Sequence, residues 1–169
     1  MKISALRSKA RRNTLKVEHI LAAAKTRAPE VKEELQRLSR EYGWSASTHL
    51  EDGTHVVPLA KWAEVAGAYA AEGIEALAPL ADAPGDAGYV IGLLEELRSQ
   101  EALGALITFF SSVMARPATA PETAWLLVKA YNHLLCTKNA VAPSQDQATQ
   151  VRSFLARVLA VATSDAQVA

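Results

Sequence analysis

Residues 86–114, DAGYVIGLLEELRSQEALGALITFFSSVM, contain two helical patterns in succession. The apolar positions of the first pattern are Val90, Leu93, Leu94 and Leu97. Those of the second are Leu103, Leu106, Ile107, Phe110, Val113 and Met114. Apolar residues spaced three and four apart line one face of a helix, and Asp86 and Ser99 are residue types that cap helix N termini. The stretch therefore predicts two consecutive amphipathic helices.

The same signals extend toward the carboxyl terminus. Residues 119–122 and 144–147 match the capping box, in which a Ser or Thr and a Glu or Gln three residues later bond each other's backbone N–H. We expect a helix after each box. The apolar residues of these two helices are Trp125, Leu126, Val128, Leu134 and Leu135, then Val151, Phe154, Leu155, Val158 and Leu159.

The amino-terminal part carries further helical segments. The first covers residues 3–25, and its apolar stripe is Leu6, Ala10, Val17, Leu21 and Ala24. The second covers residues 29–42 and ends at Gly43, since glycine readily adopts the left-handed conformation of a helix end. A third follows Pro58 as far as Gly73, and a short helical piece follows it at residues 74–80.

Residues 44–57 interrupt the helical pattern. Asp52-Gly53 lies between two short β-compatible runs, and such a pair favours a tight hairpin turn. We predict a small β-hairpin near residues 48–57, with His49 opposite Val56 and His55 opposite Leu50. Side chains alternate along a strand, so this register puts the two histidines on opposite faces and argues against a shared metal site.

These elements predict an all-α fold, either an antiparallel multi-helix bundle or a short irregular array of helical hairpins. From Ile74 onward the pattern resembles HEAT-type arrays, whose helical hairpins stack side by side. The helix starts near residues 86, 99, 119 and 144 are unevenly spaced, so an ordinary antiparallel bundle fits equally well. We divide the chain into a basic helical hairpin (1–43), a loop or small β-hairpin (44–57) and a helical body (58–169), together one compact domain.

Length and composition predict an ordinary globular protein. The chain has 169 residues, half of them hydrophobic, and a single cysteine, so no intramolecular disulfide can form. One cysteine favours a reducing compartment. No apolar run approaches the roughly 20 residues of a membrane span, and the amino terminus lacks a signal-peptide pattern. We therefore predict a cytoplasmic protein with no membrane partner.

The net charge of zero hides an asymmetry along the chain. Residues 1–40 contain eleven Lys and Arg residues but only four Glu residues, and the rest of the chain is acidic by the same margin. A basic segment of this kind suits nucleic acid or an acidic partner. It equally suits packing of the basic helices on the protein's own acidic part, which the zero total favours.

The sequence shows no motif that names a reaction. It has no Gly-rich phosphate loop, no Gly-x-Ser-x-Gly and no His-Glu-x-x-His, so we predict neither an enzyme nor a cofactor nor a metal. His133 and Cys136 are neighbours on one helix, a spacing open to a nucleophile and its base, but the apolar context favours a buried thiol. We expect Trp44, Trp62 and Trp125 in the core, with Trp44 beside the hairpin as the best exception.

The leading hypothesis is a non-enzymatic protein-interaction module of the inhibitor, immunity-protein or adaptor type. Its helical faces would bind a protein, and the acidic body would suit a basic one. The candidate partner-binding residues are Glu95, Glu96, Glu72, Glu75 and Trp44. The alternative is a nucleic-acid-associated protein that contacts phosphates with the basic first helix. Its candidate residues are Lys9, Arg11, Arg12 and Lys16.

Overall fold

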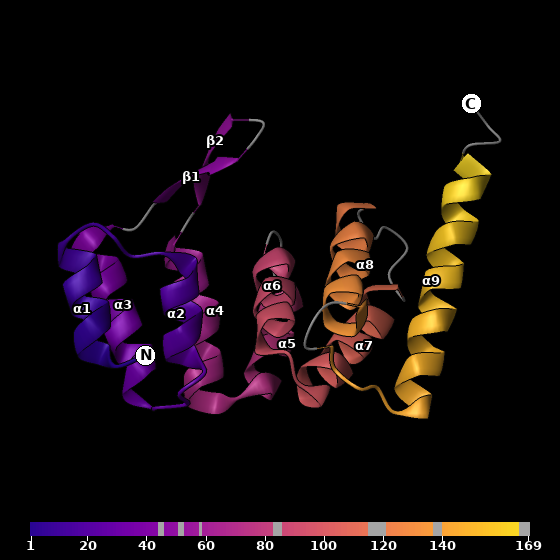
Figure 1. Ribbon diagram of the computed structural model, residues 1–169, viewed down its shortest axis with the longest axis horizontal. Coiled ribbons are helices and arrows are strands. Elements are labelled where there is room, and N and C mark those ends of the chain that lie inside the picture. The colour runs from indigo at the N-terminus through magenta and orange to yellow at the C-terminus, as the bar shows by residue number, and fades with distance from the viewer. Residues whose placement is uncertain are drawn as a thin grey trace. The chain divides into compact units, whose positions relative to one another are not determined.

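The computed structural model describes residues 1–43, 46–50, 53–57, 59–82, 86–114, 121–136 and 140–165. The regular elements within these ranges are helices apart from one two-stranded hairpin, in agreement with the predicted all-α fold (Figure 1). The elements are α1 (Ile3–Arg11), α2 (Val17–Ala24), α3 (Glu30–Tyr42), β1 (Ala46–Leu50), β2 (Gly53–Val57), α4 (Leu59–Glu72), the 3-10 helix η1 (Ile74–Ala76), α5 (Leu77–Asp82), α6 (Ala87–Leu97), α7 (Gln100–Met114), α8 (Pro121–Cys136) and α9 (Gln145–Asp165). They form two compact units, Met1–Leu93 and Leu94–Ala169.

The prediction of one continuous helix over residues 3–25 is wrong, because a turn separates α1 from α2. Asn13 has a φ of 54°, a left-handed conformation that Asn tolerates better than most residues and that ends α1. The N–H of Thr14 then donates to the carbonyl of Lys9 at 2.9 Å. The N–H of Lys16 donates to Nδ1 of His19 at 3.1 Å and so satisfies a free donor at the start of α2.

The amino-terminal unit is built around α4. Both α2 and α3 pack on α4, and α1 packs on α3, so the basic helices lie on the rest of this unit and do not project from it. The helix predicted for residues 29–42 is confirmed as α3, and Gly43 ends it with a φ of 54°. The core of this unit contains the fully buried side chains of Leu6, Ile20, Leu35 and Leu38.

Two positions in this unit require glycine, one for its backbone conformation and one for close packing. Gly73, between α4 and η1, has a φ of 96° and ψ of −163°, a region that essentially only glycine occupies. Gly92 on α6 faces the indole of Trp62 on α4, and a Cβ at that position would lie 2.6 Å from the indole Cη2. Tyr89 completes the contact, with its ring edge-on to Trp62 at a centroid distance of 5.4 Å.

The predicted hairpin is confirmed, but the predicted register is wrong by two residues. Leu50 pairs with Gly53, so only residues 51 and 52 separate the strands. His49 therefore pairs with Thr54 and His55 with Thr48. Gly53 belongs to β2 and is therefore not the second residue of the turn. Positions 49 and 55 still fall on opposite faces, because neighbouring pairs alternate between faces.

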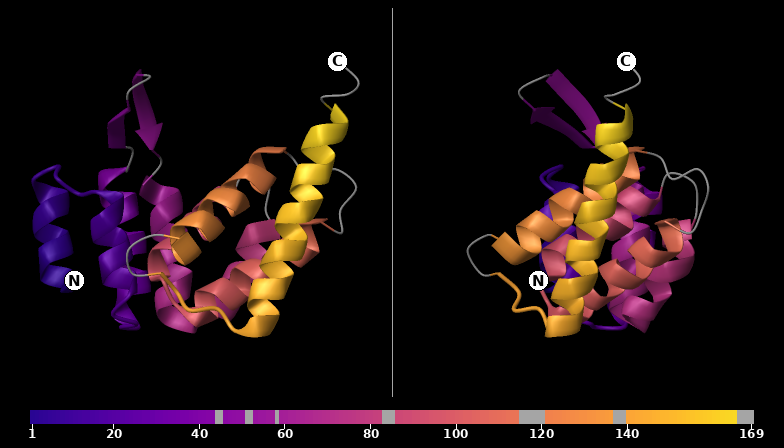
Figure 2. Two further views of the ribbon diagram at one scale, coloured as in Figure 1. Left: turned by 45° about the vertical axis from the view of Figure 1, so that its right-hand side comes forward. Right: turned by 90° about the vertical axis from the view of Figure 1, so that its right-hand side faces the viewer.

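The carboxyl-terminal unit contains α7, α8 and α9, which alternate in direction (Figure 2). The ring of Tyr131 on α8 meets Phe154 on α9 edge-on at 5.4 Å, and the Tyr131 hydroxyl donates to the carbonyl of Leu106 on α7 at 3.2 Å. Ser99 caps α7 by accepting from the N–H of Ala102. The predicted capping box before α9 is confirmed, since Ser144 and Gln147 each bond the other's backbone N–H. The box predicted at residues 119–122 involves residues outside the described ranges.

Three side chains expected in the interior of this unit are exposed. Trp125 is 68% exposed, Leu159 is 65% exposed and Cys136 is also exposed. The side of α8 that packs inward carries Tyr131 and its neighbours, and Trp125 falls on another side of the helix. On α9, Leu159 lies about 140° around the helix from buried Phe154.

Candidate binding surfaces

The exposed face of α8 is the first candidate surface. Trp125, Lys129, Asn132 and Cys136 are all exposed and follow one another at intervals of four, three and four residues. That spacing places them in one row along the helix. We call this row the α8 face. A tryptophan contributes a large contact area with few rotatable bonds, so an exposed tryptophan makes this row a candidate surface for binding another protein.

The opposite side of α8 holds the helix in its unit. Ala130, Tyr131 and Leu134 are buried there, with at most 2% of each side chain exposed. Burial raises the pKa of the Tyr131 hydroxyl, which stays protonated and donates to α7. The α8 face is therefore presented by a helix whose other side is fixed by packing and by a buried hydrogen bond.

The predicted acidic site divides between the two units. Glu72 at the end of α4 belongs to the amino-terminal unit and pairs with Lys32 of α3, with 2.5 Å between Oε1 and Nζ. Glu75 lies beside Gly73, where the guanidinium of Arg27 also approaches and stacks over Tyr69 at 4.8 Å. Both carboxylates thus lie close to cations of their own unit.

Glu95 and Glu96 belong to α6 in the carboxyl-terminal unit. Oε1 of Glu95 lies 3.5 Å from Nδ1 of His133 on α8, and Arg98 contacts the other ring nitrogen of that histidine. Glu96 is exposed. Trp44, the fifth predicted member of the site, lies outside the described residues.

The predicted basic site forms a cluster at the α1–α2 turn. Arg11, Arg12 and Lys16 are exposed and Lys9 is half-buried. Within the described part of the chain these four side chains make no ion pair, whereas Arg7, Lys32 and Arg37 each bind a carboxylate. We call these four residues the basic turn.

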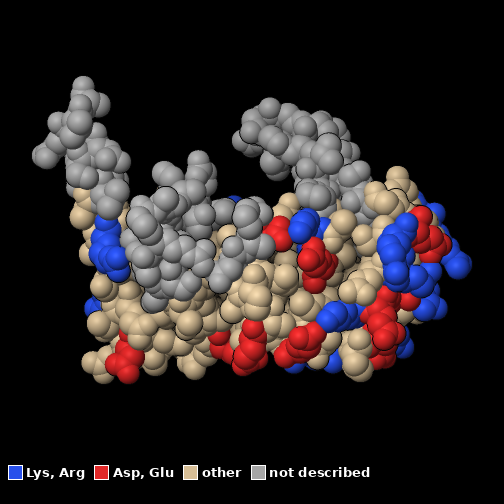
Figure 3. All heavy atoms as spheres, turned by 180° about the vertical axis from the view of Figure 1, so that it is seen from behind, with Lys and Arg blue, Asp and Glu red and all other residues tan. Residues whose placement is uncertain are grey.

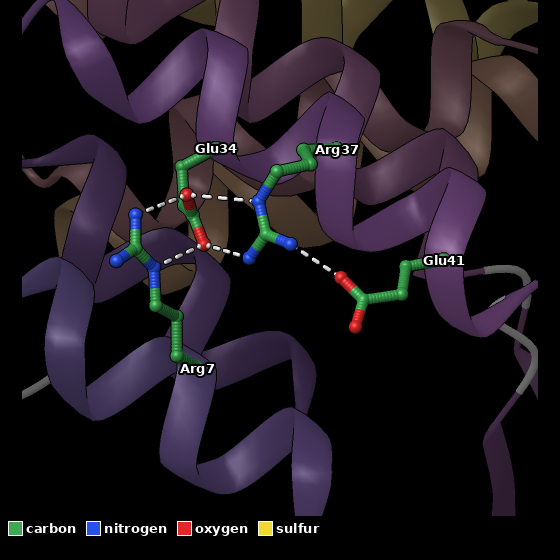
Figure 4. Close-up of polar contacts among 4 residues, drawn as sticks. All are labelled: Arg7, Glu34, Arg37 and Glu41. Atoms are coloured by element: carbon green, nitrogen blue, oxygen red, sulfur yellow. Dashed lines mark hydrogen bonds and ion pairs between the residues drawn. The ribbon is translucent and has the colours of Figure 1, made fainter.

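Sequence reasoning missed a buried carboxylate at Glu34. Its side chain is only 6% exposed. Arg7 on α1 donates to both of its oxygens at 2.9 Å, and Arg37 donates to them at 2.8 and 3.3 Å (Figure 4). Hydrogen bonds from Arg7 and then Arg37 lower the pKa of Glu34 to about 2. Glu41 binds the far side of Arg37, so the network links α1 to two turns of α3.

An open groove between α3 and α4 was also not predicted. It has a volume of about 450 Å³ and is lined by Gln36, Ser39, Arg40, Ala60, Lys61, Ala63 and Glu64. Its charges are partly neutralised, because Nζ of Lys61 lies 2.9 Å from buried Asp86 and 3.2 Å from Glu64. The hydrogen bond to Asp86 is the main reason that the pKa of Lys61 is raised.

The charge asymmetry of the sequence is resolved inside the amino-terminal unit. Residues 41–93 carry eight carboxylates and one lysine, which balances the excess of seven positive charges in residues 1–40. Residues 94–169 carry six charges of each sign. On the face drawn in Figure 3, basic and acidic side chains are interleaved over the amino-terminal unit, at the right. Each unit is thus neutral overall.

The described residues contain no cluster of three or more His, Cys, Asp or Glu side chains placed to hold a metal ion. Within the same residues, no helix has both the length and the apolar character that crossing a membrane requires. No protein family, curated protein or solved structure matches the chain.

Proposed function

We propose that this protein is a non-enzymatic protein-interaction module, of the inhibitor, immunity-protein or adaptor type, that binds its partner through helical faces. The observation that carries the proposal is the 68% exposure of Trp125 on the α8 face. Tryptophan is enriched among the residues that dominate binding energy at protein interfaces. Lys129 and Asn132 continue the row beside it and supply the polar rim that such an anchor requires.

The packing behind the α8 face supports the same proposal. A partner gains most when the surface it meets is already in its bound conformation, because little conformational entropy is then lost. Tyr131 and Leu134 hold α8 against its unit from behind, and the Tyr131 hydroxyl adds a buried hydrogen bond to α7. Trp125 therefore projects from a supported helix.

We propose further that the partner is basic and is attracted by acidic side chains of this protein. Glu96 is a candidate for this attraction, because its side chain is exposed on α6. Charges at the rim of an interface act mainly on the association rate. Glu96→Lys should therefore slow association with a basic partner about threefold to tenfold in low salt. An unchanged rate, measured by surface plasmon resonance, would remove Glu96 from the proposal.

Trp125→Ala is the direct test of the α8 face. The tagged wild-type protein and the variant are used to capture partners from native lysate with and without nuclease treatment, and the captured proteins are quantified by mass spectrometry. We expect a partner of the wild-type protein to be lost from the variant, because truncating an anchor of this kind costs about 2 kcal/mol or more, roughly thirtyfold in affinity.

The matched control is Tyr42→Ala, which truncates another exposed aromatic residue in the other unit. It should leave the capture unchanged, and both variants should melt like the wild-type protein. Equal capture by wild-type protein and Trp125→Ala would mean that the α8 face does not bind. Loss of all captured proteins on nuclease treatment would assign the association to nucleic acid.

A further inference from the structure

The basic turn is a second surface, separate from the α8 face. Lys9 and Arg11 end α1, Arg12 follows directly, and Lys16 immediately precedes α2. The negative end of the α1 dipole offsets only about half a charge, so most of the positive charge of these four side chains remains. Arg11, Arg12 and Lys16 are exposed to solvent, where a charged ligand can reach them.

The charge of the basic turn is not neutralised within its unit. The other cations of the first three helices include Arg7, Lys32 and Arg37, and each of these binds Glu34 or Glu72. In the described part of the chain, no carboxylate pairs with any of the four residues of the basic turn. The unit as a whole is neutral, so this is a local concentration of positive charge on a balanced surface.

The turn between the helices holds these charges close together. The N–H and the hydroxyl of Thr14 both donate to the carbonyl of Lys9, at 2.9 and 3.3 Å. The pKa of His19 is lowered mainly by burial and next by the charge of Lys9; Glu18 opposes this effect, and the charge of Lys16 adds a smaller lowering. The two lysines, one from each side of the turn, therefore both lie close enough to His19 to affect its pKa.

The surroundings of the basic turn identify the kind of partner. None of the large apolar side chains found exposed in the described residues belongs to residues 1–25, where Leu15 is buried beneath the turn. A protein interface normally has an apolar centre, whereas contacts to nucleic-acid phosphates need only exposed Lys and Arg. Residues 1–41 also contain no aromatic residue that could stack on an unpaired base. The chemistry fits a phosphodiester backbone and not a sequence of bases.

We propose that Lys9, Arg11, Arg12 and Lys16 form a binding surface for the phosphate backbone of double-stranded nucleic acid. The contact is independent of sequence and acts in addition to protein binding at the α8 face. Each cation that neutralises a phosphate releases condensed counterions, so four contacts give a slope of log affinity against log salt of about −3 to −4. The affinity should fall about a hundredfold between roughly 50 and 200 mM salt.

The test uses the full chain and fluorescein-labelled DNA and RNA duplexes of about 20 base pairs of arbitrary sequence, followed by fluorescence anisotropy. Arg11→Glu with Arg12→Glu should lower the affinity more than about tenfold and flatten the salt slope. Arg11→Lys with Arg12→Lys keeps the charge and should bind like the wild-type protein. The matched control is Arg152→Glu with Arg157→Glu, which makes the same charge change on exposed positions of α9.

Steep salt dependence, loss in the Arg11/Arg12 charge reversal and retention in the α9 control together support the proposal, and the two duplexes show whether DNA or RNA is preferred. Circular dichroism melts confirm that the variants are folded. The proposal is overturned by absence of binding to both duplexes in low salt, or by equal losses in the two charge reversals. Preferential binding of a polyglutamate peptide would also overturn it and would assign the surface to an acidic protein.

Discussion

Glu34 occupies a row of α3 that is otherwise apolar. Val31, Leu35 and Leu38 define that row, and position 34 falls within it by helical spacing. Glu34 lies near the amino end of the helix, where the helix dipole alone explains a carboxylate. Its spacing relative to the three apolar residues was the sequence feature that could have predicted its burial. Its partner Arg7 lies 27 residues away, and no local pattern connects the two.

The low pKa of Glu34 makes stability depend on pH. The carboxyl titrates near 2 in the folded protein and near 4.5 when unfolded, so the stabilisation is complete above pH 4.5 and is lost as the pH falls toward 2. At neutral pH, Glu34→Gln should lower the free energy of unfolding by about 1–2 kcal/mol, a figure reduced for the solvent around both arginines. Urea unfolding between pH 2 and 7 measures both effects. Parallel pH profiles for variant and wild type would refute the assignment.

At the scale of elements, local capping signals predicted helix ends well. Ser99, Ser144 and Gly43 act as expected, because caps depend on residues within one turn of each other. The sequence did not indicate the break between α1 and α2, because the apolar residues Leu15 and Val17 continue the hydrophobic pattern through the turn. The exposure of Trp125 was missed because α8 carries apolar residues on more than one face, so periodicity does not select the buried side.

The contact of α6 with Trp62 predicts a specific packing defect. A Cβ on Gly92 would lie 2.6 Å from the Trp62 ring, so Gly92→Ala should destabilise the protein by about 1–3 kcal/mol through overpacking. Trp62→Phe removes the clashing atoms, and the double variant should lose less than the sum of the single losses. Gly104→Ala is the matched control, since its Cβ would lie 3.7 Å from Gln147 and alanine favours helix. Additive losses in chemical denaturation would contradict the contact.

At the scale of the whole molecule, the two units are each neutral, although the linear charge pattern shows only a basic beginning and an acidic remainder. The sequence left two interpretations of that asymmetry open, an external polyanion or packing against the protein's own acidic part. Two pairs, Lys32 with Glu72 and Arg37 with Glu41, support the second interpretation for part of the charge. The sequence alone does not show which cations pair with carboxylates and which, like the four of the basic turn, do not. Pairs such as Lys32 with Glu72 form only because α3 packs on α4.

A charge exchange tests this internal balance. Glu72→Lys places two lysines together and should lower the melting temperature by about 1–3 °C, as expected for a partly exposed pair. Adding Lys32→Glu restores opposite charges and should recover most of the loss. Differential scanning calorimetry at low and high salt measures the effect, which should shrink as salt screens the pair. A double variant no more stable than Glu72→Lys alone would rule out pairing as the cause.

Cys136, the only cysteine of the chain, ends the α8 face. A maleimide dye can therefore be attached at one known position of the wild-type protein, about 16 Å along the helix from Trp125. Any partner that covers the row would change the brightness or polarisation of that dye, so fractions of a lysate can be screened without substituting a residue. The same accessibility means that stored protein needs a reductant, because dissolved oxygen oxidises two exposed thiols to a disulfide, and the resulting covalent dimer would hide the α8 face.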